Sequence, residues 1–489
     1  MYRNQYIISH KSKTIQVPGL IPVNFEDLVI YAHRTLNVTV AGRGSVKISL
    51  IGFIIDPSDP EASNDRIVSN LVAECPKYEK FLQAIECFTG RYVLIYKNEL
   101  SFIIAGDACH LRQIYYGRIN DSIVCTSSPK LFLDAFNIEP SISTEKMEIL
   151  HDRNFIKNES IWFGDESIDT RLKKLLPNHY LDLSEIQSKR IPVLSLSTFA
   201  NEEQILEYVA IVLRNTYKSL AGKYKLLQPL TAGWDSRILL AASRDQMDSI
   251  SYYVFDESSG TDPDAWIPSR LGKKFDLDFR ILQPGILRDG FISEYKKEHI
   301  YPRILAKTTH IQHHYDSNYD QNVLNVNGNG AEIARCYYGY TSVKITPDII
   351  FTFAESAING KFPYFRIKLK EWYDEALQYS LDSGIPMMDL FYWEQRMGNW
   401  HALWPFEQDL ALEEISPFNN RALLKALFLI KPEQRIAPRY LFITRLIEYL
   451  WKDVLSEPIN PDEKILPEYF KSNTIIRYIG VKAKIIFGL

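Results

Sequence analysis

One short segment places chemically useful side chains between two apolar runs. In the stretch LLQPLTAGWDSRILLAAS, residues 226–243, a hydrophobic run stops at Thr231 and a second one follows Ser236. This pattern predicts a strand, a loop and a helix. A loop that opens a helix presents free backbone N–H groups and the positive end of the helix dipole, which favours phosphate. The alternative is a helix capped by Asp235 or Ser236 with nothing bound.

The side chains of this loop suit a phosphate-binding role. Thr231 and Ser236 carry hydroxyl donors, and Ala232 and Gly233 allow a ligand to approach the backbone closely. Asp235 offers the oxygen ligand that Mg²⁺ prefers. The segment is not a GxxxxGK[ST] loop and no lysine follows it, which argues against a kinase or a motor-type NTPase.

The elements that must position this loop alternate between strands and helices. Strand-like runs cover 224–230, 249–257, 279–283 and 322–330, and helical patterns cover 202–222 and 263–275, the latter bent by Pro268. Such alternation predicts a parallel sheet with right-handed crossovers. Ligands of such a sheet bind beyond the carboxyl ends of its strands, where the loop lies. From about Pro347 the chain is predicted to be helix-rich.

The first part of the chain has the pattern of an antiparallel sheet. Strands are expected at 45–55 and 172–184, and hairpins at 90–107 and 113–128. A polar segment around 184–201 is the expected connection to the second part. A length of 489 residues exceeds the usual size of one hydrophobic core. We therefore predict an antiparallel β-rich domain at 1–195, followed by an α/β domain with a helical C-terminal part at 196–489.

Four stretches resemble the asparagine synthetase family. PLTAGWDSRILLAA is similar to its pyrophosphate-binding Ser-Gly-Gly-x-Asp-Ser motif. NGNGAEIARCYYGY, residues 327–340, is similar to its Gly-[Asp/Glu]-Gly-[Ala/Ser]-Asp-Glu and Gly-Tyr motif, and ALEEISPFNNRAL, residues 411–423, to Leu-Glu-x-Arg-x-Pro-Phe-x-Asp. Residues 88–117 resemble the second half of the family's glutaminase domain. The resemblance implies an N-terminal-nucleophile-hydrolase-like domain followed by a PP-loop ATP-pyrophosphatase domain.

The resemblance also implies a set of ligand-binding residues and two cofactors, ATP and Mg²⁺. Asp235 and Glu332 would hold the metal, and Glu332 stands where the family has an Asp. The residues expected to bind ATP and its pyrophosphate are Leu230, Thr231, Ala232, Gly233, Trp234, Asp235, Ser236, Tyr253, Val254, Gly328 and Gly330.

The glutaminase part of the family pattern is broken. The family uses an N-terminal cysteine as nucleophile, whereas Tyr2 stands here and the earliest cysteine is Cys75. LIGFIID replaces the Asn-Gly-Glu motif that grips glutamine. We therefore expect no glutaminase activity, and nitrogen from free ammonia or from an amine substrate.

The catalytic residues of the second part also depart from the family. Asn329 stands where relatives have Glu or Tyr, and a neutral amide cannot act as a base. Glu394 is a candidate base, with a solvated helix-face carboxylate as the alternative. Lys464 is a candidate for the family's late lysine, with a surface lysine as the alternative.

These observations predict an ATP-dependent carbon–nitrogen ligase that activates a small-molecule or peptide carboxylate as an acyl-adenylate and passes it to ammonia or an amine. Its place would be in specialised biosynthesis of an antibiotic, peptide or polysaccharide, as with β-lactam synthetase or lasso-peptide cyclase. One alternative is an inactive scaffold or regulatory relative. Another is a different adenylating chemistry such as thiolation, against which the absence of a CxxC pair argues.

Composition indicates which partners and which cellular compartment to expect. The net charge of -4 gives no reason to expect nucleic acid as a partner. The sequence has no apolar run of about 18 residues, so no membrane span is predicted, and no signal peptide is evident. Five scattered cysteines are typical of reduced thiols in a cytoplasmic protein, with a homodimer or a partner protein left open.

Two further segments have compositions that could serve a ligand site or a docking surface. The THIQHHYD segment, residues 309–316, is expected to be a polar surface or pocket segment rather than a metal site, because zinc needs three or four spaced ligands. The basic, apolar C-terminal tail from Lys471 either packs on its own domain or docks on a membrane or a partner.

Overall fold

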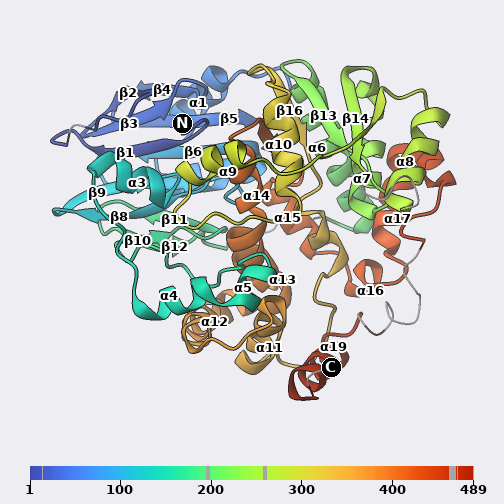
Figure 1. Ribbon diagram of the computed structural model, residues 1–489. Coiled ribbons are helices and arrows are strands. Elements are labelled where there is room, and N and C mark those ends of the chain that lie inside the picture. The colour runs from blue at the N-terminus through green and yellow to red at the C-terminus, as the bar shows by residue number, and fades with distance from the viewer. Residues whose placement is uncertain (14, 194–198, 257–261, 462–469, 471, 488–489) are drawn as a thin grey trace.

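The computed structural model describes residues 1–13, 15–193, 199–256, 262–461, 470 and 472–487. Lys464, the candidate late lysine, lies outside the described residues. Figure 1 shows two β regions, an N-terminal sandwich and a later sheet, with the C-terminal helices below and beside them.

The N-terminal strands form two six-stranded antiparallel sheets. The first has the order β10-β8-β9-β1-β3-β2, formed by β1 (Tyr6–His10), β2 (Leu20–Phe25), β3 (Leu28–His33), β8 (Tyr115–Ile119), β9 (Ser122–Thr126) and β10 (Leu172–Lys174). The second has the order β12-β11-β7-β6-β5-β4, formed by β4 (Val38–Arg43), β5 (Val46–Ile55), β6 (Thr89–Lys97), β7 (Phe102–Gly106), β11 (His179–Asp182) and β12 (Gln187–Arg190).

Helices cover both outer faces of this sandwich. The inner faces share one apolar core, in which Ile8 and Ile30 of the first sheet meet Val93 of the second. α1 (Asn64–Glu74) and α2 (Tyr78–Ala84) pack on the outer face of the second sheet, and α3 (Pro129–Phe136) packs on that of the first. The result is a four-layered α-β-β-α arrangement, and the predicted antiparallel hairpins are confirmed.

The sequence prediction was wrong at the end of the sandwich. The single strand expected at 172–184 is two strands in different sheets, β10 and β11, because Pro177 interrupts the run. The segment 184–201, expected as a connection, contributes the edge strand β12. Its sequence, QSKR, has no apolar residue for an alternation pattern to detect, and charged side chains are common on edge strands.

The second region is a parallel sheet, as predicted, and its five strands include β17 (Glu413–Ile415), which was not predicted. Its order is β15-β14-β13-β16-β17, formed by β13 (Lys225–Pro229), β14 (Ile250–Phe255), β15 (Phe279–Leu282), β16 (Val323–Val326) and β17. The chain runs outward from β13 to β15 and then returns to the other side of β13. The order therefore reverses between β13 and β16, and such a switch point is where open α/β sheets bind ligands.

Helices surround this sheet and dominate the C-terminal third, as predicted. Two helices, α4 (Thr144–His151) and α5 (Arg153–Lys157), follow α3 between the sandwich strands β9 and β10. Those between β12 and β17 are α6 (Glu202–Ala221), α7 (Trp234–Ala242), α8 (Pro263–Lys274, with Pro268 inside), α9 (Asp289–Lys297), α10 (Thr308–Asp316), α11 (Pro347–Ile358), α12 (Pro363–Ser383), α13 (Met387–Phe391) and α14 (Leu403–Gln408). After β17 come α15 (Arg421–Phe428), α16 (Pro432–Arg435), α17 (Leu441–Trp451) and α19 (Thr474–Phe487). Short 3₁₀ turns are η1 (Ile85–Cys87), η2 (Arg244–Ser249), η3 (Ala331–Arg335) and η5 (Lys452–Ser456), while η4 (Tyr392–His401) is a π-helix.

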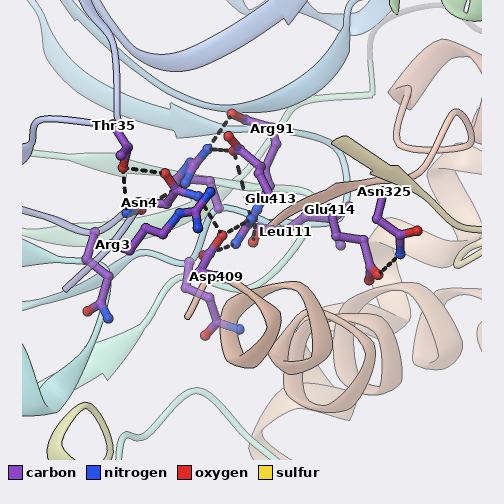
Figure 2. Close-up of polar contacts among 12 residues, drawn as sticks. Arg3, Asn4, Thr35, Arg91, Leu111, Asn325, Asp409, Glu413 and Glu414 are labelled. Atoms are coloured by element: carbon purple, nitrogen blue, oxygen red, sulfur yellow. Dashed lines mark hydrogen bonds and ion pairs between the residues drawn. The ribbon is translucent and has the colours of Figure 1, made fainter. Parts of the chain in front are cut away.

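A buried polar network joins the sandwich to the segment before β17, and Figure 2 shows it. Arg91 donates to both oxygens of Asp409 at 2.6 Å each, and Asn4 donates to the same carboxylate at 3.1 Å. Arg112 pairs with Glu413 beside them. We call Asn4, Arg91, Arg112, Asp409 and Glu413 the junction network. It stabilises the contact between two regions that lie far apart in the sequence.

The C-terminal tail packs on its own chain. In α19, the Tyr478 hydroxyl and the Lys482 ammonium both donate to Asp348 at the start of α11, at 2.6 and 2.7 Å. No helix within the described ranges is long and apolar enough to cross a membrane.

Candidate functional site

The loop between β13 and α7 lies at the switch point of the parallel sheet. It leaves β13 after Pro229, and α7 begins at Trp234 with Gly233 as its N-cap and no side-chain capping bond. The interpretation of Asp235 or Ser236 as a helix cap is therefore wrong. An uncapped helix N-terminus keeps N–H groups available for an anion.

The loop is held in shape by its own hydroxyl groups. The Ser236 hydroxyl accepts from the Thr231 N–H at 3.2 Å and lies 3.1 Å from the Thr231 hydroxyl, which in turn accepts from the Gly233 N–H at 3.2 Å. The Ala232 N–H donates to Asp264 at 2.8 Å, from the first turn of α8. These bonds fix the loop before any ligand binds.

A glycine-rich partner for the loop follows β16 directly. A Cβ at Gly328 would lie 2.8 Å from the Cβ of Asp235, so only glycine lets the two backbones come this close. Gly330 has φ +96, in the left-handed region that favours glycine, and it turns the chain into η3. The glycines of this motif thereby bring Glu332 towards Asp235.

One arginine lies between the two carboxylates. Arg335, one turn after Glu332, donates from Nη2 to Asp235 Oδ2 at 2.6 Å. Glu332 Oε2 accepts from the Gly330 N–H at 3.1 Å, and its Oε1 lies 3.8 Å from His401 Nε2. His401 is the last residue of the π-helix η4, a type of helix that is frequent at functional sites.

The charges of this cluster depend on one another. Burial raises the pKa of Asp235 to about 7 against the opposing effect of Arg335, and Glu332 adds to the rise. Burial would also raise the pKa of Glu332, but His401, Arg335 and the Tyr392 hydroxyl outweigh it and lower that pKa. Burial lowers the pKa of His401 to about 4, so the permanent cations of the cluster at neutral pH are Arg335 and Arg396.

Several polar atoms of this cluster are buried without a hydrogen-bond partner among the described residues. They are Asp235 Oδ1, Arg335 Nε, Arg396 Nε and His401 Nδ1. Such orphaned groups are rare in folded proteins and are expected where a ligand or ion completes the set. A free carboxylate oxygen on Asp235 and the nearby Glu332 suit Mg²⁺, which commonly uses one or two protein carboxylates together with substrate phosphates.

Three of the residues expected to bind ATP, at the ends of β13 and β14, have buried side chains and meet through the backbone. The Leu230 N–H donates to the Tyr253 carbonyl at 2.8 Å. The side chains of Leu230, Tyr253 and Val254 are buried, and the Tyr253 hydroxyl donates to Asn325 at 3.0 Å.

The candidate catalytic residues lie in different surroundings. Asn329 follows β16 beside the loop, with its N–H bonded to the Asn327 side chain at 3.0 Å and its carbonyl accepting from Ser416. Its amide side chain is partly exposed. Its position is therefore at the switch point, next to Gly328 and Gly330.

Glu394 lies elsewhere, in a closed ion pair. The carboxylate is fully buried and accepts from Arg190 of β12 at 2.9 and 3.1 Å, from Asn178 at 3.0 Å and from Trp372 at 2.7 Å. Burial raises its pKa, but Arg190, His179 and Asn178 together outweigh burial and the net shift is downward. The expectation of a solvated helix-face carboxylate is wrong, because Glu394 ties η4 to the sandwich.

Tyr2 stands where the asparagine synthetase family, which the sequence resembles, has its nucleophilic cysteine. Tyr2 is fully buried and its N–H donates to Glu298 at 2.5 Å. All five cysteines are free thiols, and burial raises the pKa of each one above its ordinary value. A raised pKa removes the thiolate that nucleophilic catalysis needs.

Sequence reasoning missed Arg335, Tyr392, Arg396 and His401. Arg335 lies three residues after Glu332, and this helical spacing is a signal that could have identified it. Tyr392 donates to or accepts from His401 at 3.0 Å, but nothing in the sequence links η4 to the loop. These contacts arise only from the packing of η4 beside η3.

The histidines of α10 do not form a metal site. The rings of His310, His313 and His314 gather around Phe255, with His310 stacked on it at a centroid distance of 3.9 Å. No group of three or more His, Cys, Asp or Glu side chains within the described ranges is arranged to hold a metal.

Comparisons with known proteins give remote structural likenesses alone. No protein-family model matches the chain, and no curated protein matches it. Similar solved structures include an NH3-dependent NAD synthetase from Campylobacter jejuni in complex with the nitrate ion, at 13% identity over 42% of this chain and 96% of that chain, with a TM-score of 0.23. A second is a glutamine phosphoribosylpyrophosphate amidotransferase from B. subtilis complexed with ADP and GMP, at 10% identity over 68% and 71%, with a TM-score of 0.24.

A third similar structure is a glutamine-dependent NAD+ synthetase from Acinetobacter baumannii in complex with ADP. It is 10% identical over 50% of this chain and 59% of that chain, with a TM-score of 0.21. All three TM-scores lie below 0.5, so these likenesses support no conclusion about this chain. Its fold is assigned from its own strand order and hydrogen bonds.

Proposed function

We propose that this chain is an ATP-dependent carbon–nitrogen ligase of the asparagine synthetase type. ATP would bind with its pyrophosphate over residues 231–236 and the uncapped N-terminus of α7. The observation that carries the proposal is the unpartnered, buried oxygen of Asp235 at the switch point of the sheet. Asp235 and Glu332 would hold Mg²⁺, which supplies charge neutralisation for the departing pyrophosphate.

The proposed reaction has two steps. An oxygen of the substrate carboxylate bonds to the α-phosphorus of ATP, and the bond from that phosphorus to the leaving pyrophosphate breaks. Ammonia or an amine then bonds to the acyl carbon, AMP departs with the oxygen that linked it, and the nitrogen releases a proton to solvent. Arg335 adds a fixed positive charge beside Asp235, where it would favour the negative charge that develops on the leaving groups.

The nitrogen donor is proposed to be free ammonia or an amine substrate. The buried Tyr2 and the raised pKa values of the cysteines support this, because no activated thiol is present to release ammonia from glutamine. The acid is proposed to be a small-molecule or peptide carboxylate in specialised biosynthesis, and the protein to act in the cytoplasm.

A second candidate function is an inactive scaffold or regulatory protein. The observation that favours it is the close pairing of Asp235 with Arg335, together with the bond from the Ala232 N–H to Asp264. Both contacts use groups that a nucleotide site needs. The two candidates differ in a measurable way, since only the ligase couples Mg-ATP to an acid.

Exchange of labelled pyrophosphate into ATP with pooled candidate acids tests the proposal. We expect acid-dependent exchange that falls by about 100-fold or more in Asp235→Asn, as when a main electrostatic group of an active site is removed. Asp245→Asn, an exposed carboxylate in η2, is the matched control and should exchange as the unaltered protein does. Absence of acid-dependent release of pyrophosphate or AMP across a wide acid panel would favour the scaffold.

The nitrogen donor has its own test. With an acid that supports exchange, ammonium chloride or hydroxylamine should yield amide or hydroxamate, whereas glutamine should yield neither. Product formed from glutamine by the purified chain would contradict the assignment of the sandwich as a part without glutaminase activity.

A further inference from the structure

A pocket lies away from the loop site, between the sandwich with α4 and α5 on one side and the segments 298–305 and 399–407, which precede β17, on the other. Its volume is about 260 Å³, and residues 231–236 and 328–335 take no part in its lining. Most of its wall is apolar or aromatic, with Phe155, Trp162, Tyr301 and Phe406 among the lining side chains. We call this space the Lys174 cavity, after the charged residue in its wall.

The acidic residues of this wall are all engaged by partners. Glu407 forms a two-bonded ion pair with Arg303, at 2.7 Å for each bond. Glu166 pairs with Lys146 at 3.0 Å and Lys368 at 2.9 Å. Glu298 accepts from the Tyr2 N–H and from Gln5. These carboxylates are therefore not free to bind a cationic ligand.

Lys174 differs from the other cations of the wall. Arg303 pairs with Glu407, and Lys130 pairs with Asp134. The Lys174 ammonium donates to the Gly398 carbonyl and lies 5.6 Å from the centre of the Tyr115 ring, and it forms no ion pair with a carboxylate in the described part of the chain. The residue is 5% exposed, so this charge is buried without a counterion.

Three residues in the wall of the same cavity each have a side-chain polar atom that is buried without a hydrogen-bond partner in the described structure. These atoms are the Trp162 indole nitrogen, the Ser167 hydroxyl and His299 Nε2. The indole N–H is a donor, and a hydroxyl can donate as well. A buried polar group without a partner costs free energy, so several around one cavity indicate a ligand that satisfies them.

We propose that the Lys174 cavity binds a small carboxylic acid with an apolar or aromatic body. The carboxylate pairs with the Lys174 ammonium and accepts from the Trp162 N–H and the Ser167 hydroxyl. The body of the acid packs against the aromatic side chains of the wall. This site is separate from the loop site, and the inference does not depend on the proposed ligase activity.

Burial favours the neutral amine form of Lys174, whereas pairing with a carboxylate would favour the ammonium form. It lowers the pKa of Lys174 to about 7, with Arg303 adding to the shift. A bound carboxylate supplies the negative charge that the wall does not provide, and it thereby favours the ammonium form.

Three ligands with one body and different head groups test the proposal on the unaltered full chain. Isothermal titration calorimetry at pH 6.5 compares 4-phenylbutyrate, 4-phenyl-1-butanol and 4-phenylbutylamine. We expect 4-phenylbutyrate to bind at least about tenfold more tightly than the other two, because it alone forms a desolvated charge pair with Lys174. Equal affinity of the alcohol, tighter binding of the amine, or no binding of the acid would overturn the proposal.

A variant locates the site. Lys174→Met keeps the length and apolar stem of the side chain and should weaken 4-phenylbutyrate binding at least about tenfold. Lys173→Met is the matched control, because Lys173 is exposed and pairs with Asp165. Unchanged binding by Lys174→Met, or equal loss in Lys173→Met, would contradict the assignment. The comparison of head groups decides the question even where Lys174→Met folds poorly.

Discussion

The Arg91–Asp409 pair of the junction network and the Arg335–Asp235 pair of the loop site are both arginine–carboxylate contacts, but they are completed differently. Arg91 donates from all three of its nitrogens, two of them to Asp409. Arg335 leaves Nε without a partner, and Asp235 leaves Oδ1 without one, in the described structure. The first pair is closed and joins two regions of the chain. The second is open, which is what a ligand-binding role requires.

This difference distinguishes polar groups that stabilise the fold from polar groups that are available to bind a ligand. Breaking a closed, buried pair leaves an uncompensated charge and costs stability. An open pair should instead reveal itself through binding. The predictions below test this distinction, from the largest expected effect to the smallest.

Asp409→Ala should have the largest effect on stability. It leaves the buried guanidinium of Arg91 without its carboxylate, and breaking such a pair costs about 3–5 kcal/mol. The measurement is the urea midpoint of unfolding. Asp374→Ala is the control, because Asp374 pairs with Lys370 on the exposed face of α12 and such pairs contribute about 0–1 kcal/mol. Equal losses in both variants would remove the distinction.

Lys174→Met should act in the opposite direction. Removing a buried charge that has no counterion should raise the free energy of unfolding by about 1–4 kcal/mol near pH 7. The folded pKa of about 7 lies below the unfolded value, so between about pH 7 and pH 10 the unfolded chain binds the extra proton. The unaltered protein therefore gains stability as pH rises through this window, by up to about 1.4 kcal/mol per pH unit.

Urea midpoints at pH 7, 8 and 9 check this pH dependence. The advantage of Lys174→Met over the unaltered protein should shrink as pH rises, while Lys173→Met shows no such trend. A constant difference across the three pH values would mean that Lys174 keeps its proton in the folded state and that burial does not lower its pKa.

Ser236→Ala should have the smallest effect on stability. The hydroxyl accepts from the Thr231 N–H and donates within the loop, and the loss of one such hydrogen bond costs about 1 kcal/mol. Mg-ATP affinity should fall as well, because the loop loses its fixed shape. A matched control is Ser269→Ala, since Ser269 donates within α8 to Ala265 at 2.8 Å. Equal Mg-ATP affinity in the two variants would argue that loop shape is irrelevant to the ligand.

The sequence predicted the loop site better than its surroundings, for a physical reason. Apolar runs and their turns specify a parallel sheet, and the sheet order brings the segment after β13 next to the segment after β16. Gly328 and Asp235 were therefore predictable as neighbours. The pairing of Glu394 with Arg190, 204 residues apart in sequence, was not. The Lys174 cavity was not predictable either, because the absence of a carboxylate paired with Lys174 in the described structure depends on how distant segments pack in the fold.

The same limit explains the missed strand and the missed histidine. β12 has no apolar face of its own, and β11 alone specifies its position by pairing with it. His401 reaches Glu332 only because η4 winds as a π-helix beside η3. Local pattern determines elements, whereas pairs of polar groups depend on packing between elements.

Mg-ATP binding by the full chain tests the central claim most directly. Unfolding temperature should be recorded with Mg-ATP for the unaltered protein, Asp235→Asn and the control Asp245→Asn. At about 100 times its dissociation constant, Mg-ATP should stabilise the unaltered protein and the control by about 2.7 kcal/mol. Asp235→Asn should lose most of this gain. Equal stabilisation of all three proteins, or none in any of them, would contradict the assignment of the loop and Asp235 as a Mg-ATP site.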